Sequence, residues 1–546
     1  MLALHLFGGA MPVWSETIYS QTAAGGSRQV MPYPTGDSVI NWITNEGPGT
    51  QAQPFTVPGR NYLLNSVTLQ MSDATSTLGG FSVSLRTLNT GATTSLSLVE
   101  ALSGSSNPST AGSYTYTGSG LVPLAANSSF WVLAEVGTGG GTYLWDKSTT
   151  GVGQTLILAN GPASPTLNGP LDLNDVVIFI DSGSGGLMFS VDATLIDVEG
   201  GLQFANAQGQ ALLAGGQTVL GDLNNHLFNL RAGGGEESSD GSIASSLDEG
   251  VIEGQGDGPE NPIAKRVRRS RQWEVFTTVN YGNVNLNAVG GQAGVKVDSW
   301  APGLGIERHL SRGLTLGFAV SFLSSHQSYT GGLGSLDLEG PALSAYLSFV
   351  RRNFWSDLLY SFGAYEFDTA RNPGPGIPTA NGSTRAYTNA IQYNTGWNFR
   401  FQNNTLVTGP FAGIDWLHGS LDGYSETGGG LAALRYARQS FESLVTRVGW
   451  SVSKRLKTDW ATITPQVRLS YERQHLSNNG TSVSAINAPF SAAGGNQSPG
   501  QDYMVAGSGV NFEFSPAFSM LLTYQGQFFR SDMQAHFGGV RFSYKF

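Results

Sequence analysis

The sequence predicts an all-β protein with three parts: an N-terminal β-sandwich of jelly-roll type, a short helix with a disordered linker, and a C-terminal twelve-stranded antiparallel transmembrane β-barrel. The first supporting observation is composition, since the chain has 74 Gly and 11% aromatic residues but only 12% charged residues. That charged share is about half of the usual globular value, and Gly-rich composition is typical of strands joined by many turns. The other two observations are an alternating C-terminal pattern and a sorting of its loops by length.

The C-terminal region alternates apolar residues with small or polar ones. Residues 314–322 read LTLGFAVSF, and residues 518–525 read FSMLLTYQ. A period of two places one set of side chains outward and the other inward. The polar set is mostly small or uncharged, whereas a soluble sandwich exposes many Lys and Glu. The apolar set repeatedly ends in an aromatic residue, which is typical of the aromatic girdle of a membrane barrel. Outer-membrane lipid is therefore an expected partner.

The connections between the expected strands fall into two classes. The strands are expected near residues 272–283, 294–309, 313–325, 336–351, 354–369, 384–402, 405–418, 435–455, 459–475, 501–514, 517–530 and 534–546. Every second connection is a tight turn, and most of the others are longer, up to the segment 476–500. Short periplasmic turns and longer outer loops characterise membrane barrels, and an even number of strands places both ends of the barrel on the periplasmic side.

The last strand ends the chain on an aromatic residue. Val540, Phe542, Tyr544 and Phe546 alternate back from the C-terminus. This pattern resembles the C-terminal strand that barrel-assembly machinery recognises in outer-membrane proteins. The resemblance implies that this machinery is a partner of the chain.

A helix is expected before the barrel. In residues 203–231, Leu212, Val219, Leu223 and Leu227 fall at helical spacing, although Gly215, Gly216 and Gly221 weaken a helix. A helix followed by a twelve-stranded barrel that ends in Phe resembles the autotransporter β-domain of type V secretion, over residues 203–546. In that family a helix threads the barrel and links it to a secreted passenger. The acidic, then basic, segment 232–271 departs from this pattern and leaves it open whether the helix plugs the pore.

The resemblance also raises a cleavage hypothesis at Asn224 and Asn225. Some autotransporters release the passenger when an Asn side-chain amide attacks its own backbone carbonyl, a reaction that needs a nearby carboxylate. Asp222 is the expected carboxylate. The alternative is that both Asn residues are ordinary polar residues of the helix and that the passenger stays attached.

The chain divides into five expected segments. Residues 1–15 resemble a weak or truncated secretion signal, because an apolar run lacks the basic residues that usually precede it. Residues 16–199 are the exported β-sandwich, 200–231 the helix in or near the barrel lumen, 232–271 the disordered linker, and 272–546 the barrel.

The exported segment shows short strands separated by Gly, Asn, Ser and Thr turns. The runs LNSVTL at 64–69, SYTYT at 113–117 and FWVL at 130–133 resemble the surface β-sandwich modules called choice-of-anchor domains. Trp131, Trp145 and Tyr143 could stack on a ligand such as a glycan, because aromatic faces stack on sugar rings. The alternative is that these rings belong to the core of the sandwich.

Composition also limits the chemistry. The chain has no Cys, so disulfides and thiolate metal sites are excluded, and its net charge of −10 argues against nucleic-acid binding. Residues 16–199 contain no His to activate a nucleophile. We therefore expect no enzymatic activity, no catalytic residues, no cofactor and no metal.

These observations predict an outer-membrane autotransporter of a diderm bacterium that displays a short β-sandwich at the cell surface for adhesion or for binding a glycan or a protein. Two alternatives remain open. One is a transport pore whose N-terminal domain stays in the periplasm. The other is a surface enzyme at the barrel rim, where His326, His418 and His475 fall in or near the outer loops.

Overall fold

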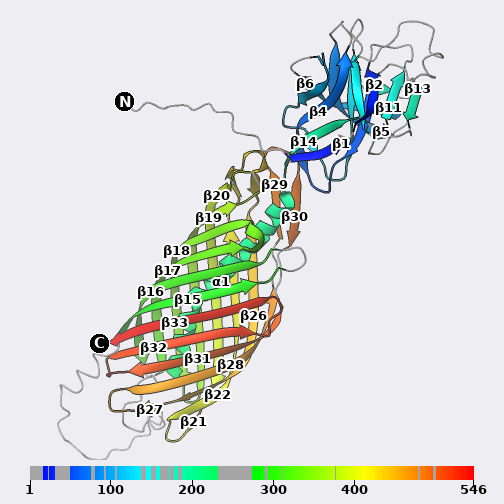
Figure 1. The fold of residues 1–546 in the computed structure, drawn as a ribbon. Coiled ribbons are helices and arrows are strands. Elements are labelled where there is room, and N and C mark those ends of the chain that lie inside the picture. Colours follow the sequence, from blue (N-terminus) through cyan, green and yellow to red (C-terminus); the bar gives the residue numbers. More distant parts are fainter. Residues whose placement is uncertain are drawn as a thin grey trace, which may run out of the picture.

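The computed structural model describes 16–21, 24–30, 50–74, 80–90, 94–104, 107–136, 143–148, 155–159, 171–172, 177–181, 187–231, 273–288, 293–311, 313–374, 377–476, 480–495 and 500–546. The expected signal (1–15) and the expected disordered linker (232–271) lie outside these residues. The predicted fold class is confirmed: a strand-rich N-terminal domain precedes one helix and a closed barrel of twelve antiparallel strands (Figure 1).

The N-terminal domain is one curled antiparallel sheet around an apolar core. Its strands are β1 (Glu16–Gln21), β2 (Ala24–Val30), β3 (Thr50–Thr56), β4 (Tyr62–Ala74), β5 (Phe81–Thr90), β6 (Thr94–Gly104), β7 (Gly112–Thr117), β8 (Pro123–Leu124), β9 (Ser129–Val136), β10 (Tyr143–Ser148), β11 (Thr155–Ala159), β12 (Leu171–Asp172), β13 (Val177–Asp181) and β14 (Phe189–Leu195). Pairing runs in the order β1-β14-β4-β7-β6-β5-β9-β3-β11-β13. Strand β6 pairs with both β5 and β7, so the two halves of the domain are continuous. Inward side chains such as Leu64, Val67, Leu85 and Val132 fill the space between the halves.

The barrel closes where the last strand pairs with the first. Its strands are β15 (Trp273–Leu286), β16 (Val295–Ser311), β17 (Leu314–Tyr329), β18 (Gly334–Arg351), β19 (Phe354–Arg371), β20 (Ala380–Trp397) with β21 (Phe399–Phe401), β22 (Leu406–Leu421), β26 (Gln439–Lys454) with β27 (Leu456–Lys457), β28 (Thr462–Leu476), β31 (Asp502–Glu513), β32 (Phe518–Phe528) and β33 (Met533–Lys545). The seam between β33 and β15 runs from Glu274↔Lys545 to Leu286↔Met533. The short turns lie at the end that holds Trp273 and Phe546, as the loop sorting predicts.

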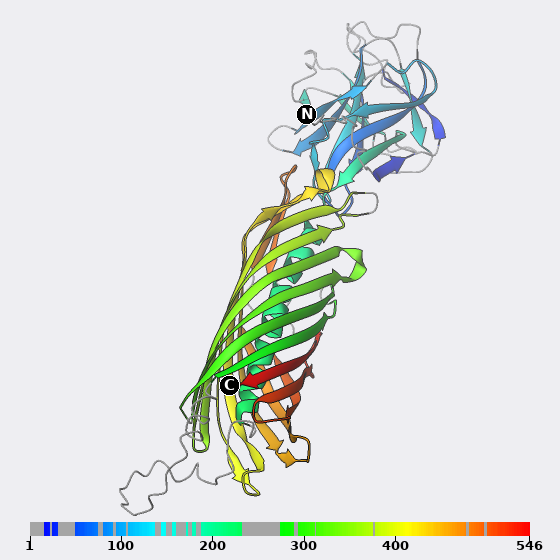
Figure 2. The same cartoon turned by 90° about the vertical axis from the view of Figure 1, so that its left-hand side faces the viewer.

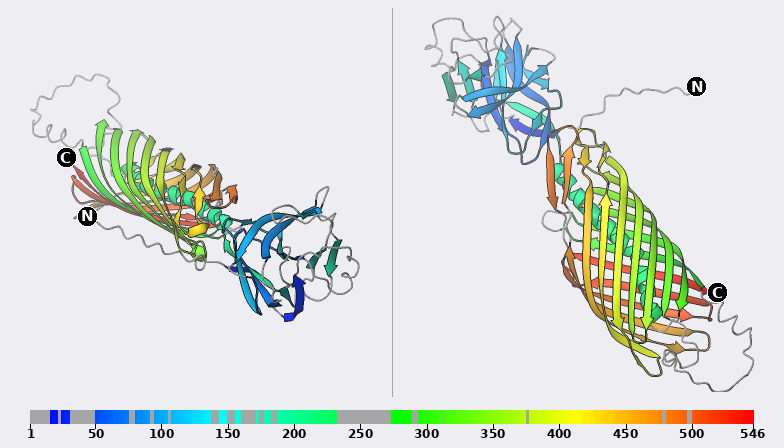
Figure 3. Two further views of the ribbon diagram at one scale, coloured as in Figure 1. Left: turned by 90° about the horizontal axis from the view of Figure 1, so that it is seen from above. Right: turned by 180° about the vertical axis from the view of Figure 1, so that it is seen from behind.

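The helix α1 (Val198–Asn229) runs along the inside of the barrel (Figures 2 and 3). Asp197 caps its start by accepting a hydrogen bond from the Gly200 amide at 2.9 Å. Its 32 residues span about 48 Å at a rise of about 1.5 Å per residue. That length exceeds a hydrocarbon core of about 30 Å, so the helix extends beyond the bilayer on the side of the N-terminal domain.

The described part of the chain contains no helix that is long and apolar enough to cross a membrane.

A second, smaller sheet stands at the outer end of the barrel. It pairs β23 (Tyr424–Ser425), β25 (Leu434–Tyr436), β29 (Gly480–Ala485) and β30 (Ser491–Gly495), and we call these four strands the outer sheet. The segment between β23 and β25 also holds β24 (Thr427–Gly428), which pairs with β20, and the 3-10 turn η4 (Gly430–Ala432). Another 3-10 turn, η3 (Thr330–Gly332), connects β17 and β18. The sequence predicts loops at 419–434 and 476–500, whereas the structure forms strands there. The pairing that joins the two segments, Leu434↔Ala485, spans about 50 residues of chain, and such a contact leaves no local pattern in the sequence.

The helix is enclosed by walls of unequal height. Strands β18, β19 and β20 have 18 residues each, whereas β31, β32 and β33 have 12, 11 and 13. About ten residues suffice to cross a bilayer, so the longer strands project past it. Figure 1 shows the outer sheet strands β29 and β30 beside the upper part of α1, and both contact the helix. The tall wall and the outer sheet thus surround the helix outside the membrane.

Candidate functional site: the helix-filled barrel

The last two turns of α1 present polar side chains to the barrel wall. Asn224 Oδ1 accepts a hydrogen bond from Asn394 Nδ2 at 3.2 Å, and Asn225 Oδ1 accepts one from Arg468 Nη2 at 2.5 Å. His226 Nε2 lies 2.7 Å from Glu307 Oε2. Each partner lies on a different strand, β20, β28 or β16. Burying polar groups is favourable only when they are paired, so these contacts fix the rotation of the helix inside the barrel.

The end of the helix is clamped by aromatic rings and a buried ion pair. The Phe228 ring packs edge-on against Trp355 and Phe411, with ring centroids 5.8 and 5.1 Å away. Arg231 pairs with Asp357, and its guanidinium carbon lies 3.6 Å from the Trp355 ring centroid. Edge-to-face rings and a desolvated cation over Trp each add about 1 kcal/mol or more beyond simple burial. These contacts hold the periplasmic end of α1 in place.

Two glycines let the middle of the helix approach the wall. A Cβ at Gly215 would lie 2.7 Å from Leu323 Cδ2, and one at Gly216 would lie 2.7 Å from Leu417 Cδ1. Real Cβ atoms do not approach other atoms this closely, so any side chain at these positions would have to displace the ends of Leu323 and Leu417. Gly weakens a helix by itself, and the close packing against Leu323 and Leu417 offsets that effect here.

The outer end of the helix packs against rings from both surrounding walls. The Phe204 ring stacks on Tyr329 of β17 at 4.5 Å between centroids. Gln208 Nε2 donates to the Tyr424 hydroxyl at 2.7 Å, and Gln208 Oε1 accepts from Gln439 Nε2 at 2.9 Å. Burial raises the pKa of Tyr424 well above its usual value, so this phenol stays protonated at neutral pH. Aromatic packing and side-chain hydrogen bonds therefore both hold the outer end of the helix against the barrel.

A buried ion pair ties the outer sheet to the tall wall. Arg371, at the end of β19, donates from Nε and Nη2 to the two oxygens of Glu426 at 2.8 and 2.7 Å. Glu426 also accepts from the Leu434 amide at 2.9 Å and from the Tyr436 hydroxyl at 3.1 Å. Bidentate Arg–carboxylate pairs of this kind are among the stronger polar contacts in proteins. The outer sheet is thus joined to the barrel by side chains as well as by its connecting segments.

A polar cavity of about 90 Å³ remains beside the helix. Asn224 and Asn225 line it, together with Asp415, Arg447 and Glu472 from the wall. Arg447 pairs with Asp415 and lies 3.5 Å from Glu472. A polar space of this size holds a few water molecules. The helix therefore occupies most of the lumen and leaves a narrow space lined by charged and amide side chains as well as apolar ones.

The outer surface of the barrel is apolar. Phe318, Val320 and Phe322 on β17 are each about half exposed, and similar side chains surround the barrel, including Leu304, Leu343, Val448 and Val467. The inward positions of the barrel strands hold many small or polar residues, such as Thr278 and Asn280 on β15 and Ser299 on β16. This arrangement confirms the alternation that the sequence predicts and places the outward band in membrane lipid.

The C-terminal strand lies at the closing seam. Phe542, Tyr544 and Phe546 are 42, 52 and 48% exposed on the lipid-facing side, and Val540 precedes them on the same face. The Phe546 amide donates to the Trp273 carbonyl at 2.9 Å. The pattern quoted from the sequence is thus one continuous row of outward side chains on the last strand. Its recognition by barrel-assembly machinery stays a prediction.

The cleavage hypothesis at Asn224 and Asn225 also stays a prediction. The structure places both residues on α1 beside the polar cavity, and the cavity brings the carboxylates of Asp415 and Glu472 to the same space. The side chain of the expected carboxylate, Asp222, lies outside the described part of the structure. The oxygens of both Asn side chains are engaged by Asn394 and Arg468.

The three aromatic residues expected to stack on a ligand are buried. Tyr143 and Trp145 are 0% exposed and belong to the core of the N-terminal domain, and Trp131 is 9% exposed. The Trp145 indole donates to the Met188 carbonyl at 2.8 Å, so its polar atom is also satisfied internally. A ring enclosed in this way offers no face to a sugar. The burial of these rings agrees with the alternative interpretation, in which they belong to the core of the domain.

The three His residues considered for a rim enzyme have separate partners. His326 lies 2.7 Å from Asp337, His418 lies 3.5 Å from Glu442, and His475 lies 2.8 Å from the Thr446 hydroxyl. They are carried by three different strands, β17, β22 and β28. Within the described part of the chain, these contacts do not bring the three His residues together into one site.

Fold and site together define a class: an outer-membrane β-barrel whose lumen holds an N-terminal helix leading to a folded outer domain. Residues 275–525 match the family model for the autotransporter β-domain. The C-terminal domain of this chain is therefore an autotransporter β-domain, the translocator of the bacterial outer membrane, and the domain that precedes it is the passenger, exposed at the cell surface. The predicted family and location are confirmed.

Solved structures similar to this chain include other translocators. The NalP translocator domain of Neisseria meningitidis has 18% identity, covers 52% of this chain and 96% of its own length, and gives a TM-score of 0.42. The β-domain of Bordetella BrkA has 12% identity over 50% of this chain and 100% of its own, with a TM-score of 0.38. The AIDA-I transport unit of Escherichia coli has 12% identity over 50% and 90%, with a TM-score of 0.34. No curated protein matches this chain.

Proposed function

We propose that this protein displays its N-terminal domain at the cell surface for adhesion or surface binding, and that the domain stays attached through α1. The observation that carries the proposal is the helix itself. It is continuous from Val198, beside the passenger, to Asn229, near the periplasmic end, and both ends are packed against the barrel. A linker held in this way supports a permanent tether.

The base of the passenger supports attachment as well. Leu63 of β4 belongs to the same apolar cluster as Ile196 and Val198 at the start of the helix. Leu434 of the outer sheet is in that cluster, and a Cβ at Gly201 would lie 2.2 Å from its Cδ1. The passenger, the helix and the outer sheet therefore share one apolar core, which favours a fixed display over release.

One face of the passenger sheet supports a binding role. Strands β4, β7 and β6 expose neighbouring hydroxyl and amide groups: Thr68 bonds Thr115 at 2.8 Å, Ser103 bonds Thr117 at 3.2 Å, and Gln70 bonds Ser113. We call these six residues the hydroxyl face. Uncharged donors and acceptors in a regular row suit a ligand that also recognises by hydrogen bonds, such as a glycan or a protein backbone.

Binding is proposed rather than catalysis. Residues 16–199 contain neither His nor Cys, the residues that most often act as a general base or as a thiolate nucleophile. The hydroxyl face, in contrast, can bind a ligand through hydrogen bonds without any reactive group.

Attachment of whole cells tests the proposal. Cells producing the wild-type protein are applied to glycan-coated and protein-coated surfaces, and surface antibody confirms equal display of each variant. We expect wild-type cells to attach to at least one coating, and protease shaving of the passenger to abolish attachment. Thr115→Arg places a long cation in the middle of the hydroxyl face, so we expect attachment to fall about tenfold, equivalent to about 1.4 kcal/mol.

Asn89→Arg is the matched control, because Asn89 is also exposed but lies on β5, outside the hydroxyl face. This variant should attach like the wild type. Attachment that survives protease shaving, or that falls equally in both variants, contradicts the proposed role of the hydroxyl face.

A further inference from the structure

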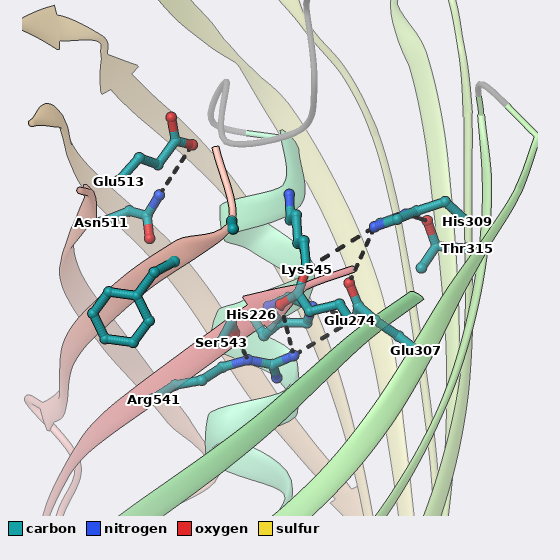
Figure 4. Close-up of polar contacts among 12 residues, drawn as sticks. His226, Glu274, Glu307, His309, Thr315, Asn511, Glu513, Arg541, Ser543 and Lys545 are labelled. Carbon is teal, nitrogen blue, oxygen red and sulfur yellow. Dashed lines mark hydrogen bonds and ion pairs between the residues drawn. The ribbon is translucent and has the colours of Figure 1, made fainter. Parts of the chain in front are cut away.

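Three potential metal ligands meet on adjacent strands near the periplasmic end of the lumen. Glu274 on β15 and Glu307 on β16 are direct partners across the sheet, and His309 lies two residues beyond Glu307 on the same inward face. One donor atom from each side chain lies within 4.8 Å of the other two. Figure 4 shows the three side chains converging. Because strand pairing sets this arrangement, the donors are held together by the backbone.

Each of the two carboxylates has one oxygen near Arg541 and the other oxygen near His309. Arg541 Nη2 lies 3.8 Å from Glu274 Oε1 and 3.6 Å from Glu307 Oε2. His309 Nε2 lies 4.0 Å from Glu274 Oε2 and 3.6 Å from Glu307 Oε1. The buried Arg541 thus orients both carboxylates and leaves one oxygen of each facing the imidazole. Partners of this kind, outside the ligand shell, normally orient the ligands of metal sites.

Glu307 supplies the second, independent observation. Its side chain is fully buried, and Oε2 accepts from the Tyr346 hydroxyl at 2.5 Å and contacts His226. Oε1 is buried and makes no hydrogen bond with any described residue. A buried carboxylate oxygen without a donor is unfavourable, and it points to the position where His309 Nε2 and Glu274 Oε2 also meet.

The imidazole is oriented for coordination. His309 Nδ1 lies 3.0 Å from the Thr315 hydroxyl, so a proton on Nδ1 can be donated to that oxygen. Nε2 would then carry the lone pair on the side of the two carboxylates. A lone pair facing two carboxylates is repulsive unless a proton or a cation lies between them.

Lys545 contacts the same group and has another partner available. Its Nζ lies 3.8 Å from Glu274 Oε2, one of the three donor atoms. Lys545 also interacts electrostatically with Glu513 of β31, whose side chain Figure 4 draws beside Asn511. The Lys545 side chain is 16% exposed and its ammonium is flexible, so a metal ion can displace it from the Glu274 oxygen.

We propose that Glu274, Glu307 and His309 bind a divalent transition-metal ion of the Zn²⁺ class. One imidazole and two carboxylates match the ligands of Zn²⁺, with water in a fourth position. Mg²⁺ and Ca²⁺ fit less well, because both prefer six or more oxygen ligands. The side chain of His309 is 27% exposed, so an ion can enter from the periplasmic mouth. A bound ion would join the first two strands of the barrel beside its closing seam.

Titration of the full-length protein tests the proposal. The chain is folded in detergent micelles, freed of metal with a chelator, and titrated with zinc chloride by calorimetry. We expect one Zn²⁺ per chain, and His309→Ala should weaken binding by at least about tenfold. Lys545→Gln removes the competing ammonium and should tighten binding, a result that a merely damaged barrel would not give. Retained heat-modifiable migration in gels verifies that each variant is folded.

His326→Ala is the matched control, because His326 also faces a carboxylate, Asp337, but lies at the other end of the barrel. Zinc binding should be unchanged in this variant. Absence of Zn²⁺ uptake by the wild-type protein at about 100 µM overturns the proposal and leaves His309 as an ordinary ion-pair partner of the two glutamates. Equal losses in His309→Ala and His326→Ala also overturn it, as does unchanged binding in His309→Ala.

Discussion

At the scale of single residues, Arg371 and Glu426 decide how the outer sheet is held. Both side chains are buried. Each oxygen of the Glu426 carboxylate accepts one hydrogen bond from Arg371 and a second one from either the Leu434 amide or the Tyr436 hydroxyl. Breaking such a pair is far more destabilising than replacing it, because the surviving charge remains in a low-dielectric environment. The pair therefore gives a sharp test of whether the outer sheet is a folded unit.

Glu426→Ala should open the outer sheet. The change leaves the Arg371 guanidinium buried without its carboxylate, and we expect a loss of about 3–5 kcal/mol in local stability. Hydrogen exchange of the β23 and β25 amides measures this loss. The double replacement Arg371→Met with Glu426→Leu removes both charges and should restore most of the protection. Amides as protected in Glu426→Ala as in the wild type would show that the pair does not hold the sheet.

Residues in the site differ in how far the sequence could predict them. Asn224 and Asn225 are visible as a polar pair within a helical pattern. The grouping of Glu274 with Glu307 and His309 is not visible, because it depends on the register of two strands that are about 30 residues apart. The position of Trp145 and Tyr143 is also not predictable, since an aromatic side chain favours a strand without specifying which face is buried.

At the scale of elements, the barrel strands were predictable and the fit of the helix was not. The alternation of lipid-facing and lumen-facing residues is carried within each strand, so it can be read locally. The close approach of the helix depends on Leu323 and Leu417, which lie far from Gly215 and Gly216 in the sequence. The joining of the two loop segments into the outer sheet has the same cause, because Leu434 pairs with Ala485 far along the chain.

Gly216→Phe should loosen the helix from the wall. The new ring would clash with Leu417, and overpacking of this kind destabilises by about 1–3 kcal/mol. We expect more frequent channel openings in planar bilayers, since a loosened helix leaves the lumen more often. Gly221→Ala is the control: a Cβ there meets nothing within 4 Å, and Ala favours a helix by up to about 1 kcal/mol. Openings that are equally frequent in both variants would contradict the packing role of Gly216.

At the scale of the whole molecule, one continuous helix links a surface domain to a membrane anchor. The general arrangement of domains follows from composition, alternation and loop sorting, all of which are properties of long segments. How the parts meet could not be predicted, because Leu63 of the passenger, Val198 of the helix and Leu434 of the outer sheet come together only in three dimensions.

Thiol cross-linking in intact cells tests this account most directly. The chain has no Cys, so Asn224→Cys with Asn394→Cys introduces the only two thiols, at side chains that are hydrogen-bonded across the lumen. With a short bifunctional thiol reagent, we expect efficient cross-linking within full-length chains whose passenger is stained by antibody on intact cells. The pair Gln208→Cys with Asn394→Cys should not react, because Gln208 lies 16 residues, or about 24 Å of helix, from Asn224, which contacts Asn394. Failure of the first pair to cross-link in surface-stained cells would contradict a helix that fills the barrel and tethers the passenger.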